Sequence, residues 1–339
     1  MEKYLITLEE HFTDERIVNE NDKFLKPHKL TKEEQEVQDF FRAHTLVGSN
    51  LTDIDVERLP HMDAQHIRMQ ILSYTSPVSD QVPAADAVRI CREANDILAG
   101  KVNEHPDRFR AMATLPMADP EAAARELERT VREKGFVGAL LAGQYQEHWY
   151  DEAAFEPIFA KAAELNAPVY LHPALINPVI RQKAYMSTAY SPIVGAELAS
   201  AGLGWHLDVG ILAIRLILAG LFDKYPSLTV IAGHWGEGMP MMLDRMDYML
   251  GRDKTGLKHE VSWYYKNNFY MTPSGIESKA NLYAMLDIMG AEHILYAEDY
   301  PYIRSESLYR FLMDDERLTD TQKALIAHGN AERLFRLRA

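Results

Sequence analysis

The first chemical pattern in the chain pairs a glutamate with a histidine two residues later. Glu9 and His11 follow a short apolar run. Side chains alternate between the two faces of a β-strand, so Glu9 and His11 should share one face and Glu10 should point to the other. A carboxylate and an imidazole placed in this way can bind one divalent cation together, although a lone Glu-x-His pair is a weak signal.

Similar residues follow three other apolar runs. His172 comes after one run, His234 and Glu237 come after the next, and Asp299 comes after the last. Taken singly, each is typical of a strand end, a turn or a helix cap. Together they predict a site of imidazoles and carboxylates that suits Zn²⁺, Mn²⁺ or Fe²⁺ and leaves positions for substrate or water. The predicted ligands are Glu9, His11, His172 and Asp299.

The elements that must position these residues alternate between short apolar strands and helices. Strands are predicted at residues 3–8, 68–74, 110–115, 136–141, 168–171, 229–232, 268–271 and 293–296. Helices are predicted at residues 84–105, 119–134, 152–165, 209–222, 319–328 and 331–337. Continuous apolar strands that alternate with helices indicate parallel pairing. Eight of them predict an α/β fold, a (β/α)8 TIM barrel whose strands bring their carboxyl ends to one face.

Two segments are longer than ordinary loops. Residues 12–57 are polar, with a helical piece at 31–43, and residues 178–205 form the second segment. Both follow the carboxyl end of a strand, where barrels build active sites, so we expect walls or lids over a pocket. Surface decoration is the alternative. No repeat or linker divides the chain, and we expect a single barrel domain over residues 1–339.

The composition limits the kinds of partner that the protein can bind and the cellular compartment in which it is expected. The 339 residues carry a formal net charge of −14, which argues against a nucleic-acid or anionic-membrane surface. The sequence contains no run of 18 apolar residues, so no membrane span is predicted. The N-terminus lacks the layout of a signal peptide, and we therefore expect a cytoplasmic protein. The one cysteine, Cys91, excludes an internal disulfide, and its helical surroundings predict a buried thiol.

Several short motifs, in their order and spacing along nearly the whole chain, resemble one branch of the amidohydrolase superfamily. This branch holds the non-oxidative aromatic acid decarboxylases, which include the γ-resorcylate, 2,3-dihydroxybenzoate and 5-carboxyvanillate decarboxylases. Aminocarboxymuconate semialdehyde decarboxylase is a more distant relative. The motifs that carry the resemblance are LEEHF at 8–12, MD at 62–63, HPDRF at 105–109, GFVGAL at 135–140, YLHP at 170–173, GLFDKYP at 220–226, GHWGEG at 233–238, DYP at 299–301 and GNAERLF at 329–335.

The resemblance implies roles for individual residues. The positions that match the family's metal ligands are Glu9, His11, His172 and Asp299. His234 and Glu237 match a hydrogen-bonded or acid–base pair beside the metal. The chain departs from many relatives at two places. Glu298 precedes Asp299 where they have serine or threonine, and Ala142-Gly143 stands where several have asparagine after the fourth strand.

Other residues are candidates to bind the substrate. Arg245, on a helical pattern at 239–250, matches a position that family members use near substrate, and the alternative is a helix-surface arginine. Phe12 and Tyr300, together with Tyr302 and Trp235, can stack on an aromatic ring, and packing in the protein interior is the alternative.

The implied reaction is the metal-dependent loss of CO₂ from a hydroxylated aromatic carboxylic acid of the 2-hydroxybenzoate type. Asp299 and His234 are both candidates to deliver a proton to the ring carbon. We expect one divalent metal ion, Mn²⁺ or Zn²⁺, with the family favouring Mn²⁺, and no organic cofactor. The family also implies a homodimer or homotetramer.

Two other functions use the same residues. A hydrolase would use a metal-bound hydroxide, generated with Asp299 as base, to attack a lactone, ester or amide carbonyl. Hydrolases share this superfamily, so the fold alone does not separate them from decarboxylases. A catalytically silent metal-binding or scaffold protein is the third interpretation, and a complete set of predicted ligands argues against it.

Overall fold

The computed structural model describes residues 3–26, 29–41, 50–75 and 81–337, and its centre is a sheet of eight parallel strands. The strands follow the order β7-β6-β5-β4-β3-β2-β1-β8. Met271, in β7, pairs with Ile294, just before β8, so the sheet closes into a barrel. The strands are β1 Leu5–Phe12, β2 Ile67–Tyr74, β3 Phe109–Ala113, β4 Gly138–Ala142, β5 Val169–His172, β6 Val230–Ala232, β7 Phe269–Met271 and β8 Tyr296–Ala297.

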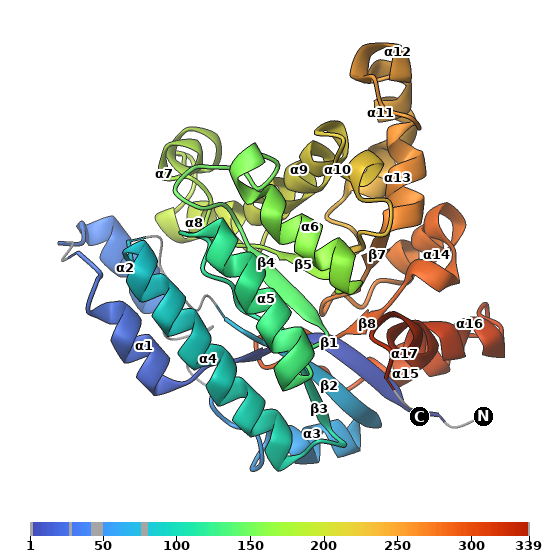
Figure 1. Ribbon diagram of the computed structural model, residues 1–339, viewed down its shortest axis with the longest axis horizontal. Helices are drawn as coiled ribbons and strands as arrows, with labels where there is room; N and C mark the ends of the chain where they lie inside the picture. Colours follow the sequence, from blue (N-terminus) through green and yellow to red (C-terminus); the bar gives the residue numbers. More distant parts are fainter. Residues whose placement is uncertain (1–2, 27–28, 42–49, 76–80, 338–339) are drawn as a thin grey trace.

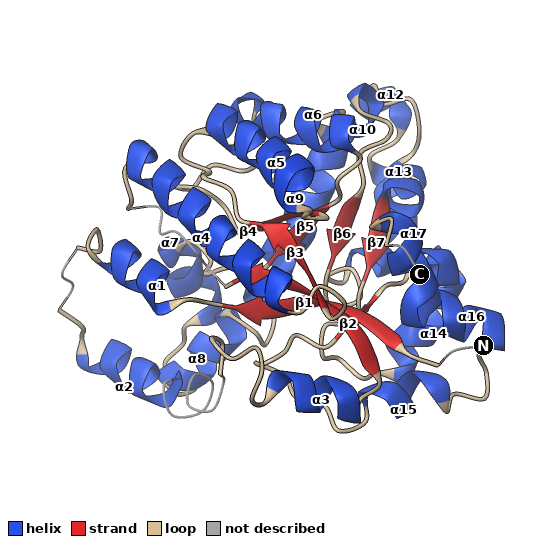
Figure 2. Cartoon of the chain, turned by 60° about the horizontal axis from the view of Figure 1, so that its bottom comes forward, coloured by secondary structure: helices blue, strands red, loops and turns tan. Residues whose placement is uncertain are grey.

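Helices cover the outside of the sheet, which confirms the predicted (β/α)8 architecture (Figures 1 and 2). They are α1 Glu15–Asp22, α2 Lys32–Phe41, α3 Arg58–Ala64, α4 Ala84–Glu104, α5 Pro120–Lys134, α6 Glu156–Leu165, α7 Pro178–Ile180, α8 Pro192–Ala199, α9 Gly204–Leu218, α10 Leu221–Lys224, α11 Leu243–Met249, α12 Arg252–Thr255, α13 Val261–Asn268, α14 Lys279–Met289, α15 Leu308–Met313, α16 Asp320–Ala324 and α17 Asn330–Leu334.

Local sequence explains where the helices around the barrel begin and end. Asp119 caps α5 by accepting a hydrogen bond from the Ala122 amide, and Pro120 occupies the first turn. Gly135 ends this helix in the left-handed conformation, which glycine adopts without strain. Buried Asn95 of α4 bonds both the amide and the carbonyl of Thr114, so it fixes α4 to the end of β3.

The core consists of two layers on either side of the barrel wall. The larger layer lies between the strands and the helices. The smaller fills the barrel with side chains such as Leu8, Ile71, Ile231 and Leu295. Burial of each such side chain stabilises the fold by about 1.5–3 kcal/mol. Cys91 is buried in α4 as predicted, and burial raises the pKa of its thiol.

Strand β1 is longer and less regular than the sequence predicted. It continues through Glu9 and His11 to Phe12, whereas the prediction ended it at Leu8. Its register against β2 shifts between Leu8 and Glu10, and Glu9 has a φ of +63°. As predicted, the side chains of Glu9 and His11 lie on one side of the strand and that of Glu10 on the other. A β-bulge rather than regular alternation produces this arrangement.

The two long segments contain helices and contact each other. Residues 12–57 carry α1 and α2, and residues 178–205 carry α7, α8 and the start of α9. Helices α2 and α8 pack side by side (Figure 2). The predicted helix at 31–43 is found as α2, and its last two residues lie outside the described part of the chain. Helix α1 was not predicted, because Ile17 is its one buried side chain and gives no periodic signal.

Among the described residues, one apolar stretch has the length and composition of a membrane span. It covers residues 192–218, with a mean hydropathy of 1.5 in its most apolar window. The sequence analysis did not find it, because it looked for an unbroken run of 18 apolar residues. The stretch is divided into α8 and α9, and α9 packs against β5 and β6. Of its most apolar window, 44% is buried, and Ile211 and Leu218 of α9 remain exposed.

Candidate metal centre and active site

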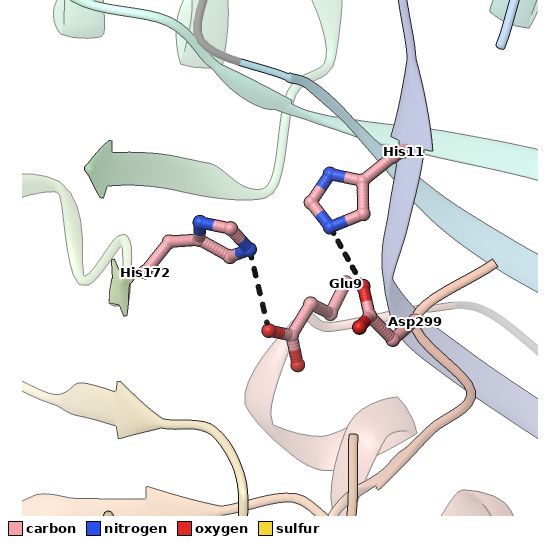
Figure 3. A group of neighbouring side chains, drawn as sticks. All are labelled: Glu9, His11, His172 and Asp299. Atoms are coloured by element: carbon pink, nitrogen blue, oxygen red, sulfur yellow. Dashed lines mark ion pairs between the residues drawn. The ribbon is translucent and has the colours of Figure 1, made fainter. Parts of the chain in front are cut away.

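Four side chains predicted to bind metal lie together at the carboxyl ends of the strands (Figure 3). Glu9 and His11 come from β1, His172 ends β5, and Asp299 follows β8. One ligand atom from each lies within 4.8 Å of those of the other three. His11 Nε2 is 3.0 Å from Asp299 Oδ1, and His172 Nε2 is 3.5 Å from Glu9 Oε1. We refer to these four residues as the ligand cluster.

Unpaired polar atoms in the ligand cluster fit a divalent cation. Glu9 Oε1 and both ring nitrogens of His11 are buried and form no hydrogen bond. The Nδ1–H group of His172 donates to the Pro173 carbonyl at 2.7 Å, which leaves the lone pair of Nε2 directed at Glu9. Burial lowers the pKa of His11 and of His172 to about 4, so both rings are neutral at pH 7. Neutral imidazole is the form that binds metal.

The second oxygen of Glu9 is held by groups that the sequence analysis missed. Tyr170 and Ser274 both donate a hydroxyl hydrogen bond to Glu9 Oε2. Gly233 makes room for them, because a Cβ atom there would lie 2.8 Å from the Tyr170 hydroxyl. Tyr170 stands two residues before His172, so strand alternation was a signal that places it on the same face. Ser274 follows β7, whose end carried no predicted site residue.

A second buried network holds the backbone around Asp299. The carboxylate of Glu10 accepts hydrogen bonds from the amides of Glu298 (3.2 Å) and Tyr300 (3.1 Å). The Glu298 carboxylate in turn is bound by His61 Nε2 at 2.8 Å and by an amide of the following loop. Burial raises the pKa of Asp299 to about 7. Glu298, one of the two positions at which the chain differs from many relatives, is therefore a buried carboxylate that holds the backbone next to the predicted ligand Asp299.

His234 and Glu237 form a hydrogen-bonded pair next to the ligand cluster. His234 Nδ1 is 2.9 Å from Glu237 Oε1, and its Nε2 is 4.0 Å from Glu9 Oε1. Burial alone would lower the pKa of His234, but the charges of Glu237 and Glu9 outweigh it and raise the pKa to about 10. Burial would likewise raise the pKa of Glu237, but His234 lowers it. At pH 7 the pair is a buried imidazolium and carboxylate.

A strained turn presents this pair to the site. His234, Trp235 and Glu237 all have positive φ, between +47° and +59°, and the glycines between and after them complete a left-handed turn. This conformation costs a non-glycine residue roughly 1–2 kcal/mol. Trp235 is buried and its indole donates to the Ile276 carbonyl at 2.9 Å. Strain of this kind is typical of functional sites that the surrounding fold holds in place.

The aromatic residues predicted to stack on substrate lie in two different environments. Phe12 is 1% exposed and packs edge-on against Tyr74, and Tyr300 is 1% exposed and stacks on His61. Protein neighbours lie against both rings, which favours the packing alternative, and substrate binding by Phe12 and Tyr300 stays a prediction. Tyr302 is partly exposed and meets the ring of His11 edge-on at 5.3 Å.

Arg245 lies on α11, a helix that projects beside α12 and α13 (Figure 1). Its side chain is exposed, with the guanidinium 5.9 Å from the ring centre of Tyr248. Substrate binding by Arg245 stays a prediction.

Comparisons with known proteins agree with this geometry. Residues 40–337 match the amidohydrolase family model. A γ-resorcylate decarboxylase of Polaromonas sp. is 35% identical, over 98% of both chains. The solved 5-carboxyvanillate decarboxylase of Sphingomonas paucimobilis is 30% identical over 99% of this chain and all of that one, with a TM-score of 0.87.

A second solved structure contains a metal. It is a dihydroxybenzoic acid decarboxylase from Polaromonas sp. with bound manganese and the inhibitor 2-nitroresorcinol. It is 33% identical, covers all of this chain and 98% of its own, and has a TM-score of 0.82. These matches cover the barrel from end to end. The chain therefore belongs to the amidohydrolase family, in the branch that holds the γ-resorcylate and 5-carboxyvanillate decarboxylases.

Proposed function

We propose that the protein is a metal-dependent, non-oxidative decarboxylase of a hydroxylated aromatic carboxylic acid of the 2-hydroxybenzoate type. The observation that carries this proposal is the ligand cluster, with its unpaired buried atoms, beside the charged pair of His234 and Glu237. Two curated relatives that match 98% of this chain are γ-resorcylate decarboxylases.

The ligand cluster would hold one divalent ion. Manganese is the proposed metal, because a solved relative contains it, and zinc accepts the same two imidazoles and carboxylates. When bound, the metal supplies Lewis acidity that favours an ionised hydroxyl next to the carboxylate of the substrate. The support for metal binding comes from this chain: two neutral histidines and a glutamate oxygen without a hydrogen-bond donor.

The reaction consumes one proton per turnover. The bond between the ring and the carboxylate breaks, its electron pair stays on the ring carbon, CO₂ leaves, and a proton adds to that carbon. Two side chains can supply the proton. His234 has a pKa raised to about 10 by Glu237 and Glu9, and in the metal-free protein burial raises the pKa of Asp299 to about 7. To act as the donor, Asp299 would have to keep its proton while the metal is bound. The edge-on contact of Tyr302 with His11 supports Tyr302 as the aromatic side chain that would contact the substrate ring.

The two alternatives explain less. A hydrolase would use the same ligand cluster, but two curated relatives that match 98% of this chain are γ-resorcylate decarboxylases. A silent scaffold would have no use for unpaired buried ligand atoms, each of which costs roughly 1–3 kcal/mol when left without a partner. We further propose that the protein forms a homodimer or homotetramer, works in the cytoplasm and uses no organic cofactor.

The test is turnover of defined benzoates by the metal-free protein reloaded with Mn²⁺ or Zn²⁺. We expect 2-hydroxybenzoates to release CO₂ and the matching phenol, and the reaction in D₂O to place one deuterium on the ring carbon that carried the carboxylate. A matched 4-hydroxybenzoate, which lacks the adjacent hydroxyl, should react far more slowly. Cleavage of esters or lactones without CO₂ release from any benzoate would overturn the proposal.

The proton donor is identified by comparing Asp299→Asn with His234→Asn. The variant that removes the donor should bind substrate but release CO₂ at a strongly reduced rate. Metal content must be measured in both, because Asp299 also belongs to the ligand cluster.

A further inference from the structure

A third side chain completes the pair of His234 and Glu237. His206 Nδ1 lies 2.7 Å from Glu237 Oε2, while His234 Nδ1 lies 2.9 Å from Oε1. The two imidazole rings are 4.2 Å apart. We propose that His206 is a positioning residue, which holds the Glu237 carboxylate so that its other oxygen stays on His234. This inference rests on the proposed decarboxylase function.

The neighbours of His206 keep a hydrogen on the nitrogen that faces Glu237. The indole N–H of Trp205 lies 3.0 Å from His206 Nε2, and an indole nitrogen can only donate. In the neutral ring Nε2 therefore accepts, and Nδ1 carries the hydrogen. When the ring is charged, Nε2–H can donate instead to the Ala201 carbonyl at 3.1 Å. Nδ1 is a donor to Glu237 in both states.

The packing of α9 brings His206 to this position. His206 and Gly210 are four residues apart on α9, so they lie on the same face of the helix. A Cβ atom at Gly210 would be 3.0 Å from the Glu237 carbonyl and 2.8 Å from the Met239 side chain. Glycine at this position lets α9 approach the left-handed turn closely, and the imidazole one turn earlier then reaches the Glu237 side chain.

Hydrogen bonds join these three residues, which are also a second group of possible metal ligands among the described residues. The separations of 2.7 and 2.9 Å between nitrogen and oxygen are ordinary hydrogen-bond lengths. The Glu237 side chain is fully buried, and each of its oxygens has one imidazole donor. Without His206, Oε2 would lack that donor, and the carboxylate would be free to turn away from His234.

The arrangement matches a general requirement of acid–base sites. An imidazole works in one orientation and one protonation pattern, which a buried carboxylate on its far nitrogen fixes. Here the carboxylate itself stands on a strained turn, and His206 is the group that fixes it. The signal was absent from the sequence because His206 lies between the long segment at 178–205 and the helix predicted at 209–222.

The first test compares three substitutions of His206. Asparagine places an amide N–H where Nδ1 stands, glutamine places it nearer to Nε2, and leucine provides no donor. We expect His206→Leu and His206→Gln to lower kcat by about 10–100-fold, the range typical of outer hydrogen-bond partners, with KM and metal content unchanged. His206→Asn should recover most of kcat. The exposed pair of His105 and Asp55 provides the control, and His105→Leu should leave kcat unchanged.

The second test does not depend on turnover. In the zinc-loaded protein, the proton NMR signal of His234 Nδ1–H should lie far downfield, remain in His206→Asn, and broaden or move upfield in His206→Leu. If His206→Leu keeps both this signal and full kcat, the positioning role is wrong. The role is also wrong if His206→Asn is as impaired as His206→Leu. Two metal ions per chain, one of them lost in His206→Leu, would replace the positioning role with a second metal site.

A milder change on α9 tests the same contact without altering His206, His234 or Glu237. Gly210→Ala should move α9 by a few tenths of an ångström, and we expect a smaller loss of kcat in the same direction as His206→Leu. If no benzoate is decarboxylated by the unchanged protein, the proposed function fails, while the NMR signal still decides whether His206 holds Glu237.

Discussion

Two neighbouring groups of histidines and carboxylates in this barrel are tuned in opposite directions. In the ligand cluster, burial lowers the pKa of His11 and His172 to about 4, and both rings are neutral. In the second group, which consists of His206, His234 and Glu237, the pKa of His234 is raised to about 10 because Glu237 faces it. Glu9 Oε1 lies within 4.0 Å of imidazoles from both groups.

The difference comes from how each group satisfies its polar atoms. The ligand cluster leaves a glutamate oxygen and two ring nitrogens without hydrogen bonds, so a cation would complete it. The second group is complete, since each Glu237 oxygen has its own imidazole donor. Residue type alone therefore does not decide between metal binding and proton chemistry. The number of unpaired atoms does.

The largest effect should follow from a break in the ligand cluster. His172→Ala removes one imidazole, and we expect the protein to lose its metal and all measurable decarboxylation while keeping its fold. Metal content by mass spectrometry and far-UV circular dichroism measure the two outcomes. Full metal retention in this variant would show that the ligand assignment is wrong.

A break in the second group should separate proton chemistry from metal binding. Glu237→Gln keeps the size of the side chain but removes its charge, so His234 is no longer held as an imidazolium. We expect kcat to fall by about 100–10,000-fold, the usual contribution of general acid–base catalysis. Metal content should stay the same. Loss of the metal along with activity would contradict the division between the two groups.

A smaller effect should follow when a support of the ligand cluster is removed. Tyr170→Phe deletes one of the two hydroxyl groups that hold Glu9 Oε2. We expect metal affinity to fall by about 10–100-fold, as is typical for such partners. Titration with a competing chelator measures this change. Tyr264→Phe is the matched control, because that buried hydroxyl binds Asp223, outside the site.

The smallest effect concerns pH. Asp299 has a pKa raised to about 7, so below pH 7 it holds a proton that metal binding must displace. His11 and His172, with pKa values of about 4, are already neutral in this range and add no dependence. Metal affinity should therefore fall by up to about tenfold for each pH unit below 7 and level off above it. Calorimetry in two buffers would show uptake of metal with release of about one proton at pH 6, and no release would contradict this.

Sequence patterns predicted the barrel and the residues of the ligand cluster because both depend on local, periodic features. Apolar runs mark strands, parallel strands bring their carboxyl ends to one face, and polar residues at those ends must then meet. The same patterns could not place Phe12 or Tyr300. An aromatic residue beside a predicted ligand can face the site or the interior, and packing against Tyr74 and His61 decides this.

The sequence by itself determined the fold class and where Glu9, His11, His172 and Asp299 meet, because strand order and strand direction follow from the pattern of the chain. Only the tertiary structure decided how these groups are tuned. Tyr170 and Ser274 reach Glu9, and His206 reaches Glu237, from parts of the chain far away in sequence. Such contacts depend on how loops and helices pack, and no local period encodes them.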